Sequence, residues 1–279
     1  MAPAGEGLAG LPEPGELHVR MSVLRMLDWG DPIPSKKAIA EEFGVVATTR
    51  SLALLAEVAA VERAVTEELV AAVRPGIVAY QLESRVKSPQ SLARKLSTVN
   101  AYRAKQTTPE DLLRYTVVAP EPDDLVEAAG DTVEALRSGG WDAEAAHHSY
   151  VDGSRYKGLH AFLRAHGMLV ELQVHSRESI DIKTQTTLLY EIERDPRQDK
   201  ETRAGARAQC VALSDGMRQP VGIERLSELG GVPMAVRSYG RSSRAPAPRP
   251  ETGTQRPAEA GPAASQRVTN LEHRKGRSR

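Results

Sequence analysis

The chain has 279 residues, 40% of them hydrophobic, and its 37 Lys and Arg residues balance its 37 Asp and Glu residues. A chain of this length can bury a core without a disulfide or a structural metal, and a single cysteine excludes an internal disulfide framework and a thiolate zinc cluster. There is no basic and apolar leader and no run of about 18 apolar residues, the length that spans a membrane. We therefore expect a protein that does not enter a membrane and works in the reducing cytoplasm.

The first quarter of the chain reads as helical. Residues 1–16 carry no periodic pattern, and we expect them to be disordered. Apolar residues then recur at helical spacing in three stretches, which predict helices over residues 17–27, 36–43 and 48–73. Together these stretches indicate a helical N-terminal extension over residues 17–74.

A strand and a helix are predicted next. From Ile77 the apolar pattern has a period of two, which predicts a strand that ends with Arg85 and Lys87. Ser88 occupies an N-cap position and Pro89 the first helical position of a helix that extends to about residue 102. The two basic residues therefore precede a helix N-terminus.

This junction suits an anion. The free N–H groups and the dipole at a helix N-terminus favour negative charge. Ser91 and Lys95 lie one turn apart and extend the positive surface from Arg85 and Lys87 along the helix. We expect a phosphate group to bind here, although a solvated basic helix end would give the same pattern.

The middle of the chain continues the alternation of strands and helices. Asp111 begins a β-branched strand up to Val118, and its carboxylate is of the type that holds Mg²⁺. A helix over residues 122–137 and a hairpin follow, and then another helix. This order predicts an α/β (α+β) fold over residues 75–195, a mixed sheet flanked by helices.

The end of the chain is basic. We expect a helical C-terminal extension over residues 196–235 and a disordered tail over residues 236–279, because the tail is rich in Pro, Ala, Ser and Gly. Residues 241–279 hold nine Lys and Arg against three Asp and Glu, a charge of +6 that leaves −6 on the rest. The tail could contact RNA or a membrane surface, or it could act only as a solubilising extension.

Three polar side chains meet on the hairpin. In a strand, alternate residues face the same side, so Glu171, Gln173 and His175 share one face. His166 and Gly167 form the predicted turn, which brings the upstream segment from Tyr156 to His160 near that face. A carboxylate, an amide and an imidazole are thus predicted to converge.

Four motifs in this order and spacing resemble the synthetase domain of the RelA/SpoT family. They are RVKSPQSLARKL at residues 85–96, DLLR at 111–114, YKGLH at 156–160 and ELQ at 171–173. The resemblance covers about residues 70–195. Long members of the family also carry a hydrolase half, for which residues 1–70 are too short, so the chain resembles a small stand-alone synthetase. It implies a nucleotidyltransferase-like fold that transfers the β,γ-pyrophosphate of ATP to the 3′-hydroxyl of GDP or GTP, making (p)ppGpp.

The resemblance also implies a role for each motif residue. Glu171 would be the general base and Tyr156 would stack on the acceptor base. The implied set is Arg85, Lys87, Ser91, Lys95 and Arg114 for ATP, Tyr156, Lys157, His160 and His175 for the acceptor, Glu171, Asp111 and Gln173 for catalysis, and Asp111 and Glu171 for Mg²⁺.

Departures from the family pattern leave the acceptor open. Leu113 stands in place of a Gly, Ser154-Arg155 in place of Asn-Gly, and His175-Ser176 in place of Arg-Thr. The last difference resembles toxic small synthetases, some of which modify the tRNA 3′ end or adenosine nucleotides. A guanosine nucleotide is the first expected acceptor, and these two are the alternatives. A non-catalytic nucleotide or RNA binder is a further reading, and a homo-oligomer or an antitoxin partner stays open.

Overall fold

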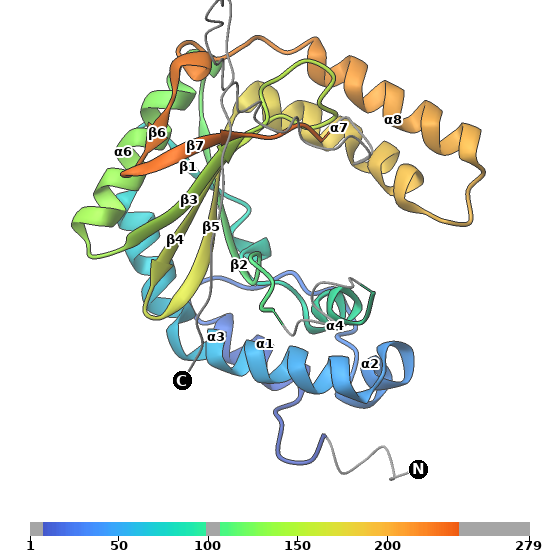
Figure 1. Ribbon diagram of the computed structural model, residues 1–279. Helices are drawn as coiled ribbons and strands as arrows, with labels where there is room; N and C mark the ends of the chain where they lie inside the picture. Colours follow the sequence, from blue (N-terminus) through green and yellow to red (C-terminus); the bar gives the residue numbers. More distant parts are fainter. Residues whose placement is uncertain (1–7, 99–106, 240–279) are drawn as a thin grey trace, which may run out of the picture. The chain divides into compact units, whose positions relative to one another are not determined.

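A mixed sheet of seven strands lies at the centre of the protein (Figure 1). The computed structural model describes residues 8–98 and 107–239. The strands are β1 (Val78–Tyr80), β2 (Leu113–Ala119), β3 (Asp142–His148), β4 (Leu159–Ala165), β5 (Met168–Ser176), β6 (Glu228–Leu229) and β7 (Val232–Val236). Their order is β1-β2-β5-β4-β3-β7-β6. The β2–β5 and β3–β7 pairs are parallel and the others are antiparallel.

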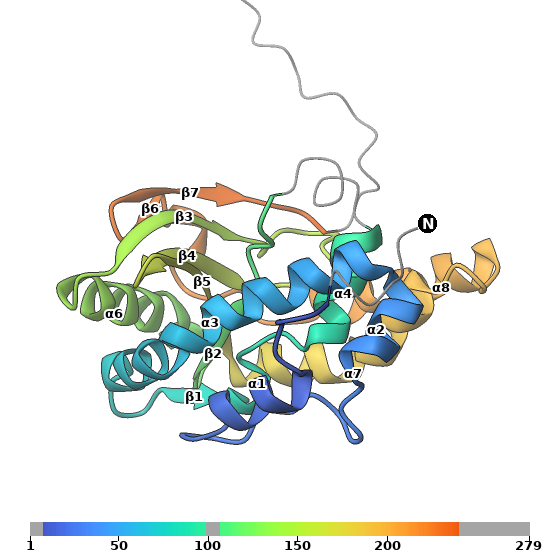
Figure 2. The ribbon, with the colours of Figure 1, turned by 90° about the horizontal axis from the view of Figure 1, so that it is seen from below.

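Helices flank this sheet, so the predicted fold class is confirmed. They are α1 (Pro14–Met21), α2 (Lys36–Phe43), α3 (Val45–Ala72), α4 (Pro89–Thr98), α6 (Leu125–Ser138), α7 (Arg177–Arg194) and α8 (Lys200–Asp215). Helices α3 and α6 lie along one side of the strands, as Figures 1 and 2 show from two directions. Helix α7 follows β5 directly and packs against α8.

The N-terminal helices share the core of the sheet. Leu52, Leu55 and Val58 on α3 are fully buried and belong to the same apolar cluster as Val117 of β2 and Leu172 of β5. The described residues all fall within one compact unit. The segment predicted as an N-terminal extension therefore helps to build the core against which the sheet packs.

The predicted hairpin is confirmed at its turn. His166 and Gly167 connect β4 to β5 with φ angles of +49° and +79°, and Ala165 pairs with Met168 across the turn. Positive φ at both central residues is the geometry that matches the twist of two antiparallel strands, and glycine adopts it without steric cost. This turn fixes the register in which β4 pairs with β5, the strand that carries the predicted polar face.

Two element predictions are wrong. The strand predicted to run from Ile77 to Lys87 ends at Tyr80, because Gln81 has a φ of +50° and a 3₁₀ turn follows at Leu82–Ser84. Within residues 196–235, only α8 and a 3₁₀ turn at Ile223–Arg225 are helical. Gly230 and Gly231 both have positive φ and form the turn of a β6–β7 hairpin, whose second strand joins the sheet beside β3.

Other predictions differ at their boundaries. Helix α1 begins at Pro14 and ends at Met21, whereas the pattern indicated residues 17–27. Residues 237–239, predicted to be part of the tail, follow β7 and pack near β3, where the Arg237 N–H donates to the His148 carbonyl. The predictions for residues 1–7, for the helix end at 99–102 and for 240–279 lie outside the described residues. Among the described helices, none combines the length and apolarity that crossing a membrane requires.

Candidate active site

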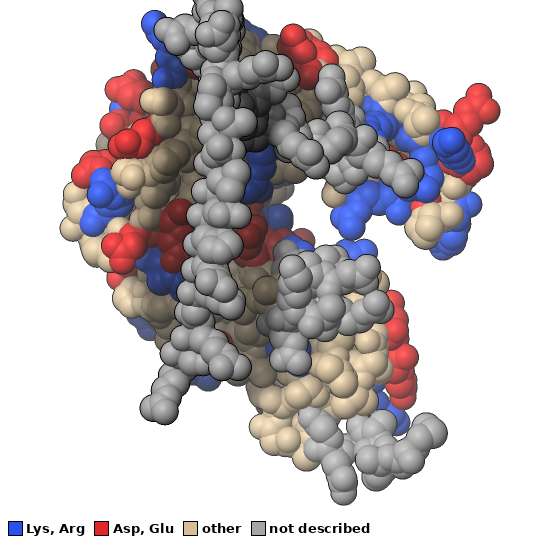
Figure 3. Space-filling model, viewed as in Figure 1, with Lys and Arg blue, Asp and Glu red and all other residues tan. Residues whose placement is uncertain are grey.

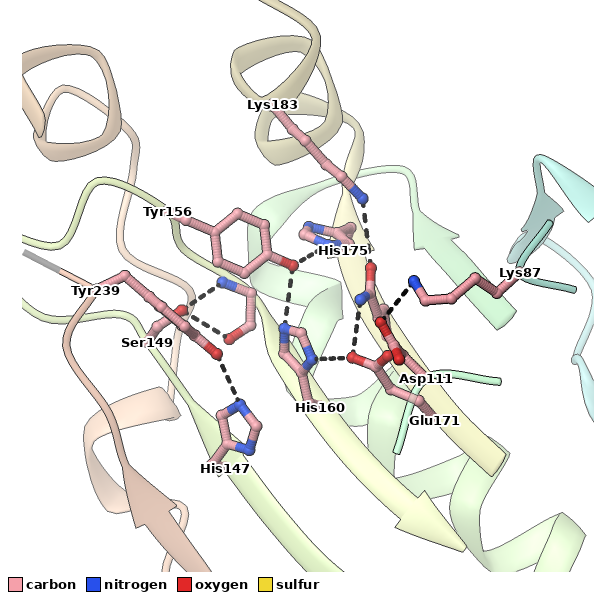
Figure 4. Close-up of polar contacts among 12 residues, drawn as sticks. Lys87, Asp111, His147, Ser149, Tyr156, His160, Glu171, His175, Lys183 and Tyr239 are labelled. Atoms are coloured by element: carbon pink, nitrogen blue, oxygen red, sulfur yellow. Dashed lines mark hydrogen bonds and ion pairs between the residues drawn. The ribbon is translucent and has the colours of Figure 1, made fainter. Parts of the chain in front are cut away.

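The polar face of β5 is the base of the candidate site (Figure 4). Glu171, Gln173 and His175 are all buried, and the Gln173 Nε2 donates to Glu171 Oε1 over 2.9 Å. His160 pairs with Gln173 across the β4–β5 ladder, and its Nδ1 lies 2.8 Å from the same Glu171 oxygen. The carboxylate and the amide therefore meet as predicted, but the imidazole in contact with Glu171 is His160 of β4 rather than the predicted His175.

Tyr156 extends this network. Its hydroxyl lies 3.0 Å from His160 Nε2 and 2.9 Å from His175 Nε2, and His175 Nδ1 lies 2.9 Å from Ser179 Oγ on α7. Burial raises the pKa of Tyr156 and lowers that of His175. A protonated phenol thus connects two imidazoles, and a continuous chain of hydrogen bonds runs from α7 to the Glu171 carboxylate.

Gly158 allows this network to close. A Cβ atom built on Gly158 would lie 2.7 Å from the Tyr156 hydroxyl and 2.9 Å from His175 Cε1. Both distances are shorter than any van der Waals contact, so a larger residue here would separate the phenol from the imidazole. The glycine of the Tyr-Lys-Gly-Leu-His motif is required by this close approach.

The Glu171 carboxylate is kept ionised. Burial raises its pKa, but the hydrogen bonds from His160 and Gln173 and the charge of Arg114 outweigh burial, so the pKa lies below its ordinary value. Both hydrogen bonds go to Oε1. Oε2 accepts no hydrogen bond from the described residues and is therefore available to the proton of an incoming hydroxyl.

Two further rings lie behind His160. The His147 ring stacks on the His160 ring with centroids 4.7 Å apart, and His147 Nε2 lies 3.2 Å from the Tyr239 hydroxyl. Burial lowers the pKa of His147 to about 3, so this imidazole is neutral. The Tyr239 ring meets the Tyr156 ring edge-on at 5.5 Å. The residues that follow β7 thus place Tyr239 at the site.

A second, basic cavity lies at the start of α4. Lys87 Nζ and Lys95 Nζ each lie 2.8 Å from a different oxygen of Asp111. Burial raises the pKa of Asp111, but the two ammonium groups outweigh it and keep the pKa below its ordinary value. The Ser91 N–H donates to Ser88 Oγ, so Ser88 caps the helix as predicted. The cavity has a volume of about 170 Å³.

Arg114 connects the basic cavity to a larger one. It is the register neighbour of Glu171 in the β2–β5 pair, and it lines both cavities. The larger cavity, of about 360 Å³, is lined by Arg114, Arg155, Tyr156, His160, Gln173, Lys183, Thr186, Thr187, Tyr190, Cys210 and Tyr239. Figure 3 shows this side of the molecule hollowed, with Lys and Arg side chains around the hollow.

Several of these lining residues were not predicted. Lys183, Thr187 and Tyr190 lie on one face of α7, at a spacing of three to four residues. That spacing was visible in the sequence as a polar helix face, but nothing local indicated that the face covers a cavity. Tyr239 had no sequence signal, because it reaches the site only through the pairing of β7 with β3.

Arg85 does not lie in the predicted ATP site. Its side chain is fully buried. Its Nε donates to Glu62, and its other guanidinium nitrogens donate to the carbonyls of Leu82, Met21 and Arg25. The prediction that Arg85 binds ATP is wrong in this structure, because the strand expected to present it ends at Tyr80 and the side chain points into the core.

Lys157 also departs from its predicted place. It is buried, and its Nζ lies 3.0 Å from an oxygen of Asp215 at the end of α8. The same carboxylate accepts the Gly153 N–H. Lys157 is not among the residues that line the large cavity. The ion pair fastens the loop before Tyr156 to α8, so we assign Lys157 to positioning this loop rather than to contact with the acceptor.

A Mg²⁺ ion at this site would need ligands from the substrate in addition to protein carboxylates. Among the described residues, no group of three or more His, Cys, Asp or Glu side chains could hold a metal ion. Mg²⁺ commonly uses one or two protein carboxylates and takes its other ligands from water and substrate phosphates. Asp111, whose oxygens now pair with lysines, and Glu171 are the carboxylates that fit that more limited role.

Comparisons with known proteins find several similar solved chains, among them the following two. No family model and no curated protein matches the sequence. The chain is similar to a GTP pyrophosphokinase family protein from Streptococcus pneumoniae, with 16% identity, a TM-score of 0.34, and 63% of this chain and 89% of that one covered. It is also similar to small alarmone synthetase 1 from Bacillus subtilis bound to its product pppGpp, with 14% identity, a TM-score of 0.32, and 50% and 72% covered. Because both TM-scores lie below 0.5, the function has to follow from the residues of this chain.

Proposed function

We propose that the protein transfers the β,γ-pyrophosphate of ATP to the 3′-hydroxyl of a nucleotide, with GDP or GTP as the acceptor. One observation carries this proposal. The ionised Glu171, with one free oxygen, neighbours Arg114, which joins a basic cavity to an aromatic one. The order and spacing of the four sequence motifs supports the same reaction.

The basic cavity suits the triphosphate of the donor. Lys87 precedes α4 and Lys95 lies on it, so two positive charges meet at Asp111, and Ser91 lines the same cavity. Phosphate oxygens would compete with Asp111 for these ammonium groups. Lys and Arg side chains around a transferring phosphoryl group stabilise the charge that develops there.

The transfer itself needs a base and a leaving group. The acceptor 3′-oxygen forms a bond to the β-phosphorus of ATP, and the bond between that phosphorus and the α,β-bridging oxygen breaks. AMP leaves with the electron pair, and Glu171 Oε2 takes the proton of the hydroxyl. When bound, Mg²⁺ would neutralise phosphate charge, with Asp111 and Glu171 as its protein ligands.

The large cavity suits the acceptor. The Tyr156 ring forms part of its wall, and its hydroxyl is tied to His160 and His175. Aromatic stacking tolerates every base, so the same cavity would also take an adenosine nucleotide or the tRNA 3′ end. The acceptor therefore has to be identified by experiment.

A labelled-phosphate assay tests the proposal. Purified protein is incubated with Mg²⁺ and γ-labelled ATP, and separately with GDP, GTP, additional ATP or total tRNA. We expect label on GDP or GTP. Label on tRNA alone would mean that tRNA is the acceptor and that the proposed type of reaction is still correct. The absence of labelled product from every acceptor, with ATP binding intact, would favour a non-catalytic binder.

Removing residues 241–279 separates the acceptors further. A free nucleotide needs no basic arm, so the truncated protein should keep its rate with GDP or GTP. A tRNA acceptor would gain phosphate contacts from the +6 segment, and its apparent KM would then rise and its salt dependence flatten on truncation.

A further inference from the structure

Lys183 is a cation at the reaction centre that the proposed reaction has not yet used. It lies on α7, and its side chain lines the large cavity and points toward β5 (Figure 4). Its Nζ donates to Gln173 Oε1 over 3.3 Å, and Gln173 in turn donates to Glu171 over 2.9 Å. Two hydrogen bonds therefore separate this ammonium group from the proposed base.

The partly buried ammonium group of Lys183 contacts an amide oxygen. Among the described residues it makes no ion pair, and its one hydrogen-bond partner is an amide oxygen. Burial lowers its pKa to about 8, the charge of Arg114 acts in the same direction, and Glu171 acts against them. Lys183 and Arg114 thus line the same cavity and are close enough for their charges to repel, an arrangement that an anion between them would stabilise.

The other basic groups nearby are already paired. Arg155 pairs with Glu193, and Lys157 pairs with Asp215. The hydroxyl groups of Thr186 and Thr187 donate to carbonyls of their own helix. Within the described lining of this cavity, Lys183 and Arg114 are the cations left without an acidic partner.

We propose that Lys183 and Arg114 together bind the pyrophosphate group as it passes from donor to acceptor. Lys87 and Lys95 would hold the donor phosphates from the α4 side, and Lys183 would meet the same group from the α7 side. Arg114 lines both cavities and so lies at the boundary that the group must cross. The inference rests on the proposed function, and it makes Lys183 a residue that touches the transferred group.

Three variants test the role of Lys183. Lys183→Met removes the charge and keeps the length of the side chain, Lys183→Arg keeps the charge, and Lys200→Met changes an exposed lysine at the start of α8. Calorimetry measures binding of inorganic pyrophosphate to each. We expect Lys183→Met to bind about tenfold to hundredfold more weakly, the scale of one charge-assisted hydrogen bond, and the other two to bind like the wild type.

Turnover gives the second readout. In Lys183→Met, kcat should fall at least about tenfold while the acceptor KM changes less, because the lost contact is to the transferred group. If Lys183→Met fails to fold by circular dichroism, Lys183→Gln replaces it. Unchanged pyrophosphate binding in the uncharged variant would overturn the inference, whether kcat changes or not. A wild-type protein that binds pyrophosphate through Lys183 and transfers none would instead overturn the proposed function.

Discussion

The Nε atom of Arg85 donates to Glu62 Oε1 over 2.5 Å, and the two side chains are 0% and 3% exposed. This buried pair ties α3 to the turn before α4, and three backbone carbonyls complete the coordination of the guanidinium. A buried pair whose members satisfy each other leaves a costly unpaired charge when one member is removed. The arrangement makes Arg85 a structural residue.

Replacing Arg85 should therefore affect folding first. We expect Arg85→Met to lower the free energy of unfolding by about 3–5 kcal/mol in urea titrations. The exposed pair of Arg63 and Glu67 on α3 offers a control, and Arg63→Met should cost less than about 1 kcal/mol. An Arg85→Met protein with wild-type stability and weakened ATP binding would restore Arg85 to the ATP site.

Lys87 should be needed for the donor. Lys87→Ala is expected to weaken ATP binding by about 1.5–3 kcal/mol, the range of a hydrogen bond to a charged group. Lys37 is 85% exposed and pairs only loosely with Glu41 at 3.9 Å, so Lys37→Ala serves as the matched change of surface charge. If calorimetry gives equal ATP affinities for the two variants, Lys87 does not bind ATP and serves only as the ion-pair partner of Asp111.

Gly158 should be sensitive to a single methyl group. Gly158→Ala would push the Tyr156 hydroxyl away from His175, and a misplacement of about 1 Å at a catalytic site costs about a hundredfold in rate. Gly205→Ala is the control, since nothing lies within 4 Å of its added Cβ. We expect Gly158→Ala to lose most of its transfer rate and Gly205→Ala to keep it. Equal rates would show that the Tyr156 network is not used.

His147 should make the fold sensitive to acid. The pKa of His147 is about 3 in the folded protein and has an ordinary value of 6.5 in the unfolded chain. Between these values only the unfolded chain binds the proton, so the free energy of unfolding falls as the pH falls from 6.5 toward 3. The slope for one such group approaches about 1.4 kcal/mol per pH unit.

His147→Phe should remove this loss and keep the ring that stacks on His160. Urea midpoints at pH 7 and pH 5 are compared for the wild type, His147→Phe and, as a control, His166→Gln in the exposed hairpin turn. The wild type and the His166 variant should lose more stability on acidification than His147→Phe. Equal losses in all three proteins would mean that His147 is protonated in the folded state.

Local patterns predicted the part of the site that lies on one supersecondary unit. The period of two along β5 and the His166-Gly167 turn determined which side chains share a face, and both are short-range effects. Ser88 was predicted as a helix cap in the same way, because a capping residue contacts only the first turn of the helix that follows it. These predictions required no knowledge of what packs against the strands.

The remaining site residues depend on distant packing. Arg85 appeared as an exposed cation, but Glu62, 23 residues earlier, pairs with it in the core. Lys183 and Tyr239 reach the cavity because α7 follows β5 and because β7 joins the sheet beside β3. Neither residue is marked by its own neighbours in the sequence, so these contacts emerge only from the arrangement of the sheet.

The central claim is tested most directly by the by-product of ATP. The protein is given Mg²⁺, ATP and GDP or GTP, and the released adenine nucleotide is measured against the phosphorylated guanosine product. We predict AMP in equal amount to that product, and a rate at least about a hundredfold lower for Glu171→Gln at unchanged ATP affinity. Release of ADP, or full activity in Glu171→Gln, would contradict pyrophosphate transfer with Glu171 as the base.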